Sequence, residues 1–194
     1  GSLVLYLDRK QVEGFFGEEI WREHGLKNVH VPNPEIFMVQ RFIETPGDRF
    51  TSYRVITVGG EILGGVLTAS RQTKSEIRRG VPWAYTGYDI TAKLAGVLGT
   101  YPIASNLSAG GFQIPLSHKP HKTLPPEYKQ ILKEHGIDPE ALGIPSHLES
   151  LASRAGRELT RCGIVVAGQD WLQDGEGKFY FLEPNPDPGL TAIS

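Results

Sequence analysis

Gly168 to Gly189 reads Gly-Gln-Asp-Trp-Leu-Gln-Asp-Gly-Glu-Gly-Lys-Phe-Tyr-Phe-Leu-Glu-Pro-Asn-Pro-Asp-Pro-Gly, and this stretch decides the fold. A mostly apolar run over residues 164–172 leads into it. A turn signal follows at 174–177, and a second β-prone run follows at 178–182. Two such runs around a glycine-rich turn predict a β-hairpin.

The predicted hairpin brings three oxygen-bearing side chains together. With a symmetric turn, Asp170 lies opposite Phe181, and Gly168 lies opposite Glu183. Asp170 and Glu183 are then diagonal neighbours on one face, about 5–8 Å apart, because residues two apart on a strand share a face. Asn185 continues that face beyond the strand, and Gly168 admits a close approach. Such oxygen ligands suit Mg²⁺.

Two other interpretations of the hairpin stay open. Charged residues often lie on the solvated face of a hairpin and bind nothing. A loop of three residues would also break the alternation and move Asp170 to the opposite face.

The hairpin resembles the metal-binding end of the ATP-grasp ligases, which include D-alanine–D-alanine ligase, glutathione synthetase and RimK-type glutamate ligases. The family pattern is a Gly-x-Asp strand followed by Glu-x-Asn and a Pro-Gly, as in Val-Ala-Gly-Gln-Asp-Trp-Leu and Phe-Leu-Glu-Pro-Asn-Pro-Asp-Pro-Gly-Leu here. The resemblance implies that Asp170, Glu183 and Asn185 bind Mg²⁺, or alternatively Mn²⁺, on the phosphates of ATP. Gln169 replaces a small apolar residue of the family and is not one of these ligands.

A strand is predicted over residues 36–43, Ile-Phe-Met-Val-Gln-Arg-Phe-Ile. It resembles the strand that joins the two ATP-grasp lobes. The resemblance implies that the backbone here contacts the adenine edge and that the following glutamate accepts hydrogen bonds from the ribose hydroxyls. The nucleotide-binding residues implied in this segment are Gln40, Arg41, Phe42, Ile43 and Glu44.

A second hairpin is predicted from strands at 53–58 and 61–67, because Gly59-Gly60 is a two-residue turn signal. Arg54 lies in its first strand and Arg71 follows its second. An arginine on a strand is an edge residue with its charge in water about as often as it is a functional residue. In the family, arginines at such positions reach toward the phosphates or the acylphosphate, so the resemblance implies a catalytic role for Arg54 and Arg71.

A loop with the pattern Ser-Asn-x-x-x-Gly-Gly resembles a RimK-type loop in which the asparagine meets nucleotide phosphate. The implied nucleotide-binding residues are Asn106, Gly110 and Gly111. The RimK type has an arginine where Ala104 stands here and an acidic residue where Ser52 stands here. These departures put a RimK-type substrate in doubt.

The remaining pattern predicts three helices. The first spans about 9–24, and the second spans 127–135 and ends at Gly136. The third starts with a capping box at Ser146-His147-Leu148-Glu149. Residues 75–80 are predicted to be charged and solvated, and 115–126 to form a loop. The expected core positions are Val12, Phe15, Phe16, Ile20, Leu148, Leu151, Ala152, Ala155, Leu159 and Cys162.

Composition narrows the class of protein. The chain has 194 residues, enough for one domain or two small lobes. Its net charge is −2, without the excess of positive charge that proteins use to bind nucleic acid or anionic membranes. Neither is therefore expected as a partner. The single cysteine excludes an internal disulfide and fits a reducing, cytoplasmic location. No apolar run approaches about 18 residues, and no signal peptide is evident.

These patterns predict an α+β fold with an antiparallel sheet and packed helices. By resemblance, residues 35–194 form the ATP-grasp C-terminal lobe and 1–34 are a remnant of the small lobe. The implied function is an ATP-dependent ligase that joins a small-molecule carboxylate to an amine or similar nucleophile. An ATP-grasp kinase and a nucleotide-binding module without turnover are alternatives. This sequence has no counterpart of the family's phosphate-binding lysine, of its glycine-rich loop or of the helix after Pro-Gly. The resemblance therefore implies that the sequence is a fragment. Alone it is expected to be inactive, unless a partner or a homo-oligomer completes the ATP-binding cleft.

Overall fold

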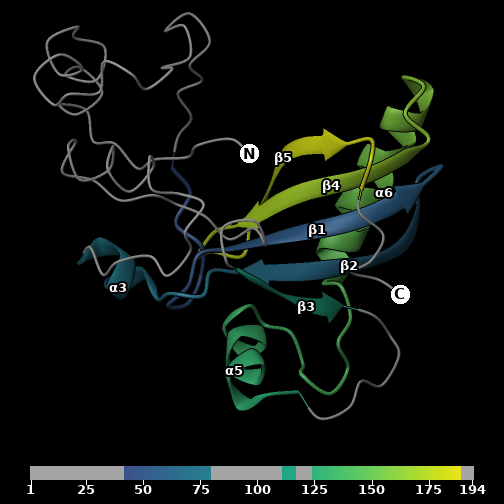
Figure 1. Cartoon of the computed structure of the whole chain (residues 1–194). Helices are drawn as coiled ribbons and strands as arrows, with labels where there is room; N and C mark the ends of the chain where they lie inside the picture. The colour runs from purple at the N-terminus through teal and green to yellow at the C-terminus, as the bar shows by residue number, and fades with distance from the viewer. Residues whose placement is uncertain (1–41, 80–110, 117–123, 189–194) are drawn as a thin grey trace, which may run out of the picture. The chain divides into compact units, whose positions relative to one another are not determined.

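The structure is a computed structural model, and it describes residues 42–79, 111–116 and 124–188. The chain separates into two compact units. One contains the short helix α3 (Lys74–Arg78), in which Lys74 and Ile77 are buried. Within the segment 75–80 that was predicted to be solvated, Ser75, Arg78 and Arg79 are exposed, and the prediction is wrong for Ile77. The other unit contains all the described strands and carries the candidate site (Figure 1).

The larger unit is built on a five-stranded antiparallel sheet with the order β3-β2-β1-β4-β5. The predicted α+β class with an antiparallel sheet is confirmed. The strands are β1 (Thr51–Val58), β2 (Glu61–Ala69), β3 (Phe112–Leu116), β4 (Val166–Gln173) and β5 (Phe179–Asn185).

The β1–β2 hairpin forms where the sequence predicts it. Gly59 and Gly60 have φ angles of 61° and 92°. Positive φ at both central residues is the geometry of a type I′ turn, which glycine adopts without steric cost. Ile56 pairs with Gly64, whereas Thr57 pairs with Ile62. The residue between them, Leu63, is therefore bulged out of the ladder and is 57% exposed.

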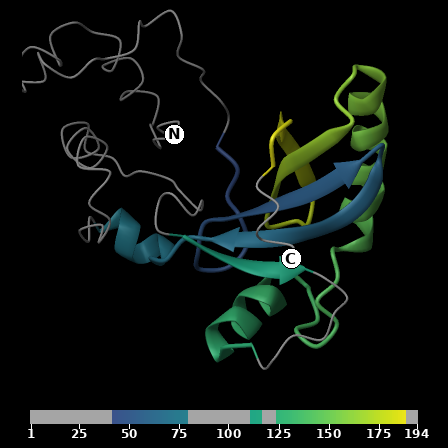
Figure 2. The same ribbon diagram turned by 45° about the vertical axis from the view of Figure 1, so that its right-hand side comes forward.

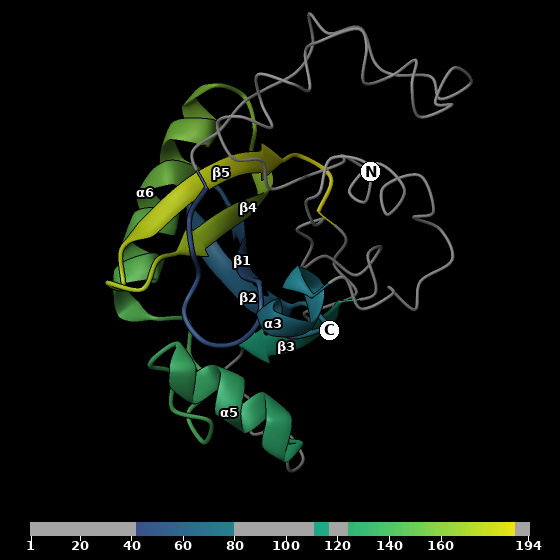
Figure 3. The ribbon, with the colours of Figure 1, turned by 90° about the vertical axis from the view of Figure 1, so that its left-hand side faces the viewer.

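Two helices cover one face of the sheet, called here the helical face (Figures 2 and 3). Helix α6 (Ser146–Arg161) packs on β1, β2 and β4, and helix α5 (Pro126–Glu134) adds Ile131 and Leu132 to the same core. The core between the layers includes Tyr53, Val55, Leu67, Ile114, Leu116, Leu148, Ala152, Trp171 and Phe179. The core therefore lies between the sheet and the helices, whereas Phe181 and Leu182 of the edge strand β5 are exposed.

Helix α6 approaches the sheet closely because Gly156 has no side chain. A Cβ atom at Gly156 would lie 2.9 Å from Thr57 Oγ1 and 3.0 Å from Gly60 Cα. Gln169, which is fully buried on this face, donates hydrogen bonds to Thr57 Oγ1 (3.0 Å) and to the carbonyl oxygen of Ala152 (2.9 Å). Gln169 therefore joins the sheet to α6.

Buried polar groups also attach the end of α5 to the sheet. The His135 ring lies 3.0 Å from the Thr51 hydroxyl, the Tyr53 hydroxyl and Gln173 Oε1. Burial raises the pKa of Tyr53 above its ordinary value, so its hydroxyl stays neutral and donates to Gln173. Gly136 follows with a φ of 68°, which confirms the predicted helix end.

The β4–β5 hairpin confirms the predicted strands but corrects their register. Gln173 pairs with Phe179, and Trp171 pairs with Phe181. The loop between the strands, residues 174–178, therefore has an odd number of residues and is called here the odd loop. The register then shifts at a bulge, and Asp170 pairs with Glu183. The predicted pairing of Asp170 with Phe181 is wrong because neither the odd loop nor the bulge is visible in the hydrophobic pattern.

Strand β3 includes Pro115 and Leu116, which were predicted to begin a loop. Pro115 lies within this strand. The strand is at the edge of the sheet, where the missing N–H of a proline is tolerated. The predicted loop over 115–126 is therefore wrong at its start.

Cys162 is exposed, which corrects its predicted core position. Helix α6 ends at Arg161, so Cys162 lies in the following turn rather than on the buried stripe. Leu148 and Ala152 are buried, and Leu151, Ala155 and Leu159 are half-buried. Ser146 begins the helix, but no side chain makes a capping hydrogen bond there. The predicted helix at 9–24 lies outside the described residues.

Candidate functional site

The face of the sheet opposite the helices carries the candidate site and is called here the carboxylate face. Arg54 on β1 pairs with Asp170 on β4, which in turn pairs with Glu183 on β5. Direct cross-strand partners share a face, with Cβ atoms about 4.5–5.5 Å apart. Three charged side chains therefore form one row across three neighbouring strands.

A second row runs beside the first and contains Ile56, Gly168 and Asn185. Asn185 thus lies on the same face as Asp170 and Glu183, and it belongs to β5 rather than following it. The bulge near Leu182 produces this alignment, because it cancels the change of face that the odd loop would otherwise cause.

Arg54 binds Asp170 with both arms of its guanidinium. Arg54 Nε donates to Asp170 Oδ1 and Nη2 donates to Oδ2, each at 2.7 Å. The Arg54 and Asp170 side chains are 33% and 16% exposed. A bidentate, partly buried pair of this kind is among the stronger ionic contacts in proteins. Asp170 is therefore held in one orientation.

The charge of Arg54 is stabilised by its surroundings. Its hydrogen bonds to Asp170 raise the pKa of the guanidinium, burial lowers it, and the charges of Asp170 and Glu183 raise it further, with a net increase. Stabilisation by a group with a raised pKa is complete below the ordinary pKa of that group. Arg54 therefore stays charged and adds no pH dependence near neutrality.

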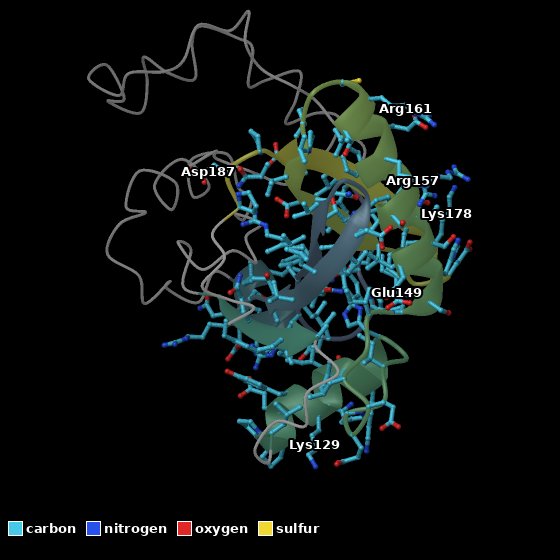
Figure 4. The ribbon with its side chains drawn as sticks, turned by 90° about the vertical axis from the view of Figure 1, so that its right-hand side faces the viewer. Lys129, Glu149, Arg157, Arg161, Lys178 and Asp187 are labelled. Carbon is cyan, nitrogen blue, oxygen red and sulfur yellow. The ribbon has the colours of Figure 1, made fainter. Side chains whose placement is uncertain are left out.

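Glu183 and Asn185 differ in how they are held. Glu183 is exposed, and no ion pair within the described residues involves it. Asn185 Oδ1 accepts a hydrogen bond from the backbone N–H of Asp187 at 3.0 Å. An amide oxygen has two lone pairs, so one remains for a ligand. Asp187 lies on the opposite side of the sheet from Arg157 and Arg161 of α6 (Figure 4).

Pro188 packs against Gly168. A Cβ atom at Gly168 would lie 2.8 Å from Pro188 Cβ and 3.5 Å from Arg54 Cδ. The glycine therefore admits Pro188 and the stem of Arg54. A ligand was expected to approach Gly168 closely, but Pro188 of the same chain occupies that position. The backbone after β5 turns back over the second row of the carboxylate face.

The donor set on the carboxylate face is two carboxylates and one amide. Within the described parts of the chain, no group of three His, Cys, Asp or Glu side chains could hold a metal ion. Asp170, Glu183 and Asn185 provide hard oxygen atoms, which Mg²⁺ accepts together with water and substrate phosphates. The guanidinium of Arg54 already occupies both carboxylate oxygens of Asp170, so a metal ion at these residues would have to share Asp170 with Arg54.

Apolar and small polar residues next to the charged row are buried. Ile56, Val66 and Thr68 are 2%, 2% and 5% exposed. Val66 is the β2 partner of Arg54. The charged row therefore begins beside buried strands and ends at the exposed Glu183 on the edge strand. A ligand would reach it from the β5 side.

Among the other predicted site residues, the structure describes Arg71, Phe42, Ile43, Glu44 and Gly111. Arg71 is exposed and follows the end of β2, beyond the rows that contain Arg54 and Ile56. Phe42 and Ile43 are half-buried and are not in a strand, and Glu44 is exposed. Gly111 precedes β3. The predicted positions Gln40, Arg41, Asn106 and Gly110 lie outside the described residues.

Three features of the site were missed in the sequence. Arg54 contacts Asp170, and the sequence holds no signal for it because the two are far apart along the chain. Pro188 covers Gly168, also without a signal. The turn at Asn185 did have a sequence signal. In Asn-Pro-Asp, the asparagine side chain readily accepts a hydrogen bond from the backbone N–H two residues on.

No protein-family model matches this chain, and no curated protein matches its sequence. Among the described residues, none of the helices has the length and apolar character that crossing a membrane requires. The geometry of the carboxylate face therefore carries the functional argument.

Proposed function

We propose that the carboxylate face binds the metal-complexed phosphates of ATP and that the chain is part of an ATP-dependent ligase of the ATP-grasp type. The observation that carries the proposal is the row of Arg54, Asp170 and Glu183 across three strands, with Asn185 beside it. One cationic side chain, Arg54, contacts Asp170 there, and Glu183 and Asn185 add a second carboxylate and an amide on the same face. This combination suits a phosphate chain bridged by a divalent cation.

Each residue has a separate role in this proposal. Asp170, Glu183 and Asn185 hold Mg²⁺, with Mn²⁺ as a substitute, and Mg²⁺ supplies charge neutralisation on the phosphates. Arg54 binds phosphate oxygens with its planar fork. The backbone at Phe42, Ile43 and Glu44 contacts the nucleoside, as the family resemblance implies.

The proposed reaction joins a carboxylic acid to an amine. The γ-phosphoryl group of ATP moves to the substrate carboxylate and ADP is released. The amine then attacks the acyl carbon, and phosphate leaves. Such a transfer depends on positioning and on electrostatic stabilisation rather than on covalent chemistry by the protein. A charged row fixed on a packed sheet meets this requirement.

The test is ADP release by the full-length protein, screened with amino acids and small carboxylic acids. A ligase releases ADP only with a carboxylic acid, and an amine increases the rate. Glu183→Gln should remove most of the turnover and leave the free energy of unfolding unchanged, because Glu183 is exposed. Glu176→Gln, an exposed change in the turn of the same hairpin, is the matched control and should keep full turnover.

Other results would point elsewhere. ADP release that requires a hydroxyl-bearing acceptor would favour the kinase alternative. ATP binding without ADP release under any acceptor would favour a binding module. A protein that binds no ATP, or a Glu183→Gln variant as active as wild type, would contradict the proposal.

A further inference from the structure

Asp170 already has a cationic partner in the ligand-free protein. Both of its carboxylate oxygens accept hydrogen bonds from Arg54 at 2.7 Å, and Arg54 is its only ion-pair partner among the described residues. This inference rests on the proposed function, which assigns Asp170 to the metal. Any metal ion that binds there must share Asp170 with a guanidinium.

The local charge makes this sharing unfavourable for a free divalent cation. Arg54, Asp170 and Glu183 together carry one positive and two negative charges. A cation beside Asp170 gains attraction from the two carboxylates but is repelled by Arg54, which remains charged at all ordinary pH values. Partial burial of the pair lessens the screening by water and salt.

A polyphosphate on the cation changes this balance. Phosphate oxygens match the planar fork of arginine as well as a carboxylate does, so Arg54 can exchange one bidentate partner for another. The metal can then coordinate Asp170 while the guanidinium of Arg54 pairs with the phosphate oxygens. The repulsion between Arg54 and the metal is offset by the phosphates between them.

The packing around Arg54 allows this exchange. Its stem lies beside Gly168 and Pro188, because a Cβ atom at Gly168 would be 3.5 Å from Arg54 Cδ and 2.8 Å from Pro188 Cβ. The Arg54 side chain is one-third exposed, and the charge of Glu183 also acts on its guanidinium. The guanidinium can therefore move between Asp170 and an added anion while the stem stays in place.

We propose that Arg54 is a specificity residue, which makes the carboxylate face prefer a divalent cation that already carries a polyphosphate over the free cation. The arginine acts as a built-in counterion in the ligand-free state. It is displaced only by a ligand that brings its own anionic partner. The ligand class is a metal-complexed nucleoside triphosphate or inorganic triphosphate.

The experiment measures Mn²⁺ binding by electron paramagnetic resonance, with Mn²⁺ alone and with Mn²⁺ plus ATP, for wild type and variants. Arg54→Gln should bind Mn²⁺ alone about tenfold more tightly than wild type, because one repulsive charge is removed. The same variant should bind Mn²⁺-ATP about tenfold more weakly, because the phosphate fork is lost. The ratio of the affinity for Mn²⁺-ATP to the affinity for Mn²⁺ alone should therefore fall about a hundredfold.

Two further variants sharpen the test. Arg54→Lys keeps the charge but not the fork, so it should bind Mn²⁺ alone as wild type does and Mn²⁺-ATP more weakly. Arg161→Gln removes an exposed arginine that pairs with Glu158 on α6, and should change neither affinity. Replacing ATP with inorganic triphosphate shows whether the phosphates alone suffice. Denaturant unfolding of each variant checks that the fold is retained.

The outcomes separate this inference from the proposed function. If wild type binds Mn²⁺-ATP but Arg54→Gln binds Mn²⁺ alone no more tightly, Arg54 only orients Asp170, and the inference is overturned while the function stands. If Arg54→Gln is unfolded, equal binding of Mn²⁺ alone to wild type and Arg54→Lys upholds the inference, and tighter binding to Arg54→Lys overturns it. If folded wild type and Arg54→Gln bind neither form, both proposals fail.

Discussion

The two faces of the sheet use neighbouring residues of the same strands for opposite purposes. Tyr53 and Val55 of β1 are buried under the helices, and Arg54 between them pairs with Asp170 on the other side. On β4, Gln169 likewise faces the helices and contacts α6, whereas Asp170 lies on the opposite face and contacts Arg54. The helical face therefore fixes the backbone, and the carboxylate face presents charged groups at the positions that the backbone sets.

The comparison shows how packing on one face of the sheet helps to hold the charged side chains on the other face. Alternation along a strand places every second residue on the opposite face, so packing on one side orders side chains on the other. Substitutions of the buried residues on the helical face should change stability, and those of the charged residues on the carboxylate face should change binding. The following predictions test that division.

The largest expected effect is the loss of a core side chain on the helical face. Leu148 of α6 is fully buried in the core, so Leu148→Ala should lower the free energy of unfolding by about 2–5 kcal/mol. Glu183→Gln on the carboxylate face should change it by less than about 0.5 kcal/mol, as exposed substitutions usually do. Denaturant titration measures both. Equal losses would show that Glu183 has a structural role.

Gly156→Ala should also destabilise the helical face, but less. The added methyl group would lie 3.0 Å from Gly60 Cα, and overpacking of this kind costs about 1–3 kcal/mol. The better helix propensity of alanine offsets only about 1 kcal/mol. Ser150→Ala, on the exposed side of α6, is the control and should not destabilise. A more stable Gly156→Ala variant would mean that α6 is not held closely against the sheet.

Gly168→Ala should disturb the carboxylate face with a smaller effect on stability. Its methyl group would lie 2.8 Å from Pro188 Cβ, and the segment after β5 can move outward to relieve the contact. The expected loss is near the lower end of about 1–3 kcal/mol.

The amide resonance of Asp187, which donates to Asn185, reports the displacement in an NMR spectrum of Gly168→Ala. Gly175→Ala lies in open space in the β4–β5 turn and is the matched control. If the Asp187 resonance is as unaffected by Gly168→Ala as by Gly175→Ala, Pro188 does not pack on Gly168.

The smallest effect concerns the turn that sets the odd loop. The pKa of Asp174 is lowered, first by the hydrogen bond from the Lys178 backbone, and also by the Tyr180 hydroxyl and the Glu176 backbone. A lowered pKa gives stability that is present above the ordinary value of about 4 and is lost as pH falls through the folded value. Wild type should therefore lose stability relative to Asp174→Asn as acid is added. Parallel unfolding midpoints from neutral pH to about pH 3 would contradict this.

The elements with strong local signals could be predicted from sequence. Gly59-Gly60 fixes the first hairpin, and the apolar stripe from Leu148 predicts α6 with its core face. Strand β3 was missed because Pro115 reads as a loop residue, and only its place at the edge of the sheet makes the strand possible.

The candidate site was predicted only in part. Asp170 and Glu183 were expected on one face from a symmetric turn, and they do share a face. The reason differs, because the odd loop and the bulge near Leu182 cancel each other. The contact between Arg54 and Asp170 depends on pairing between β1 and β4, which no local pattern encodes. Local rules therefore found the residues of the site but not their contacts.

The most direct test of the site is a map of paramagnetic broadening by Mn²⁺-ATP in an NMR spectrum of the labelled chain. Broadening falls steeply with distance from Mn²⁺, so it locates the metal. The amide resonances of Arg54, Asp170, Glu183 and Asn185 should broaden first, and those of α6, across the sheet, should broaden last. Strongest broadening on α6, or none on the carboxylate face at concentrations where Mn²⁺-ATP binds, would contradict the proposed site.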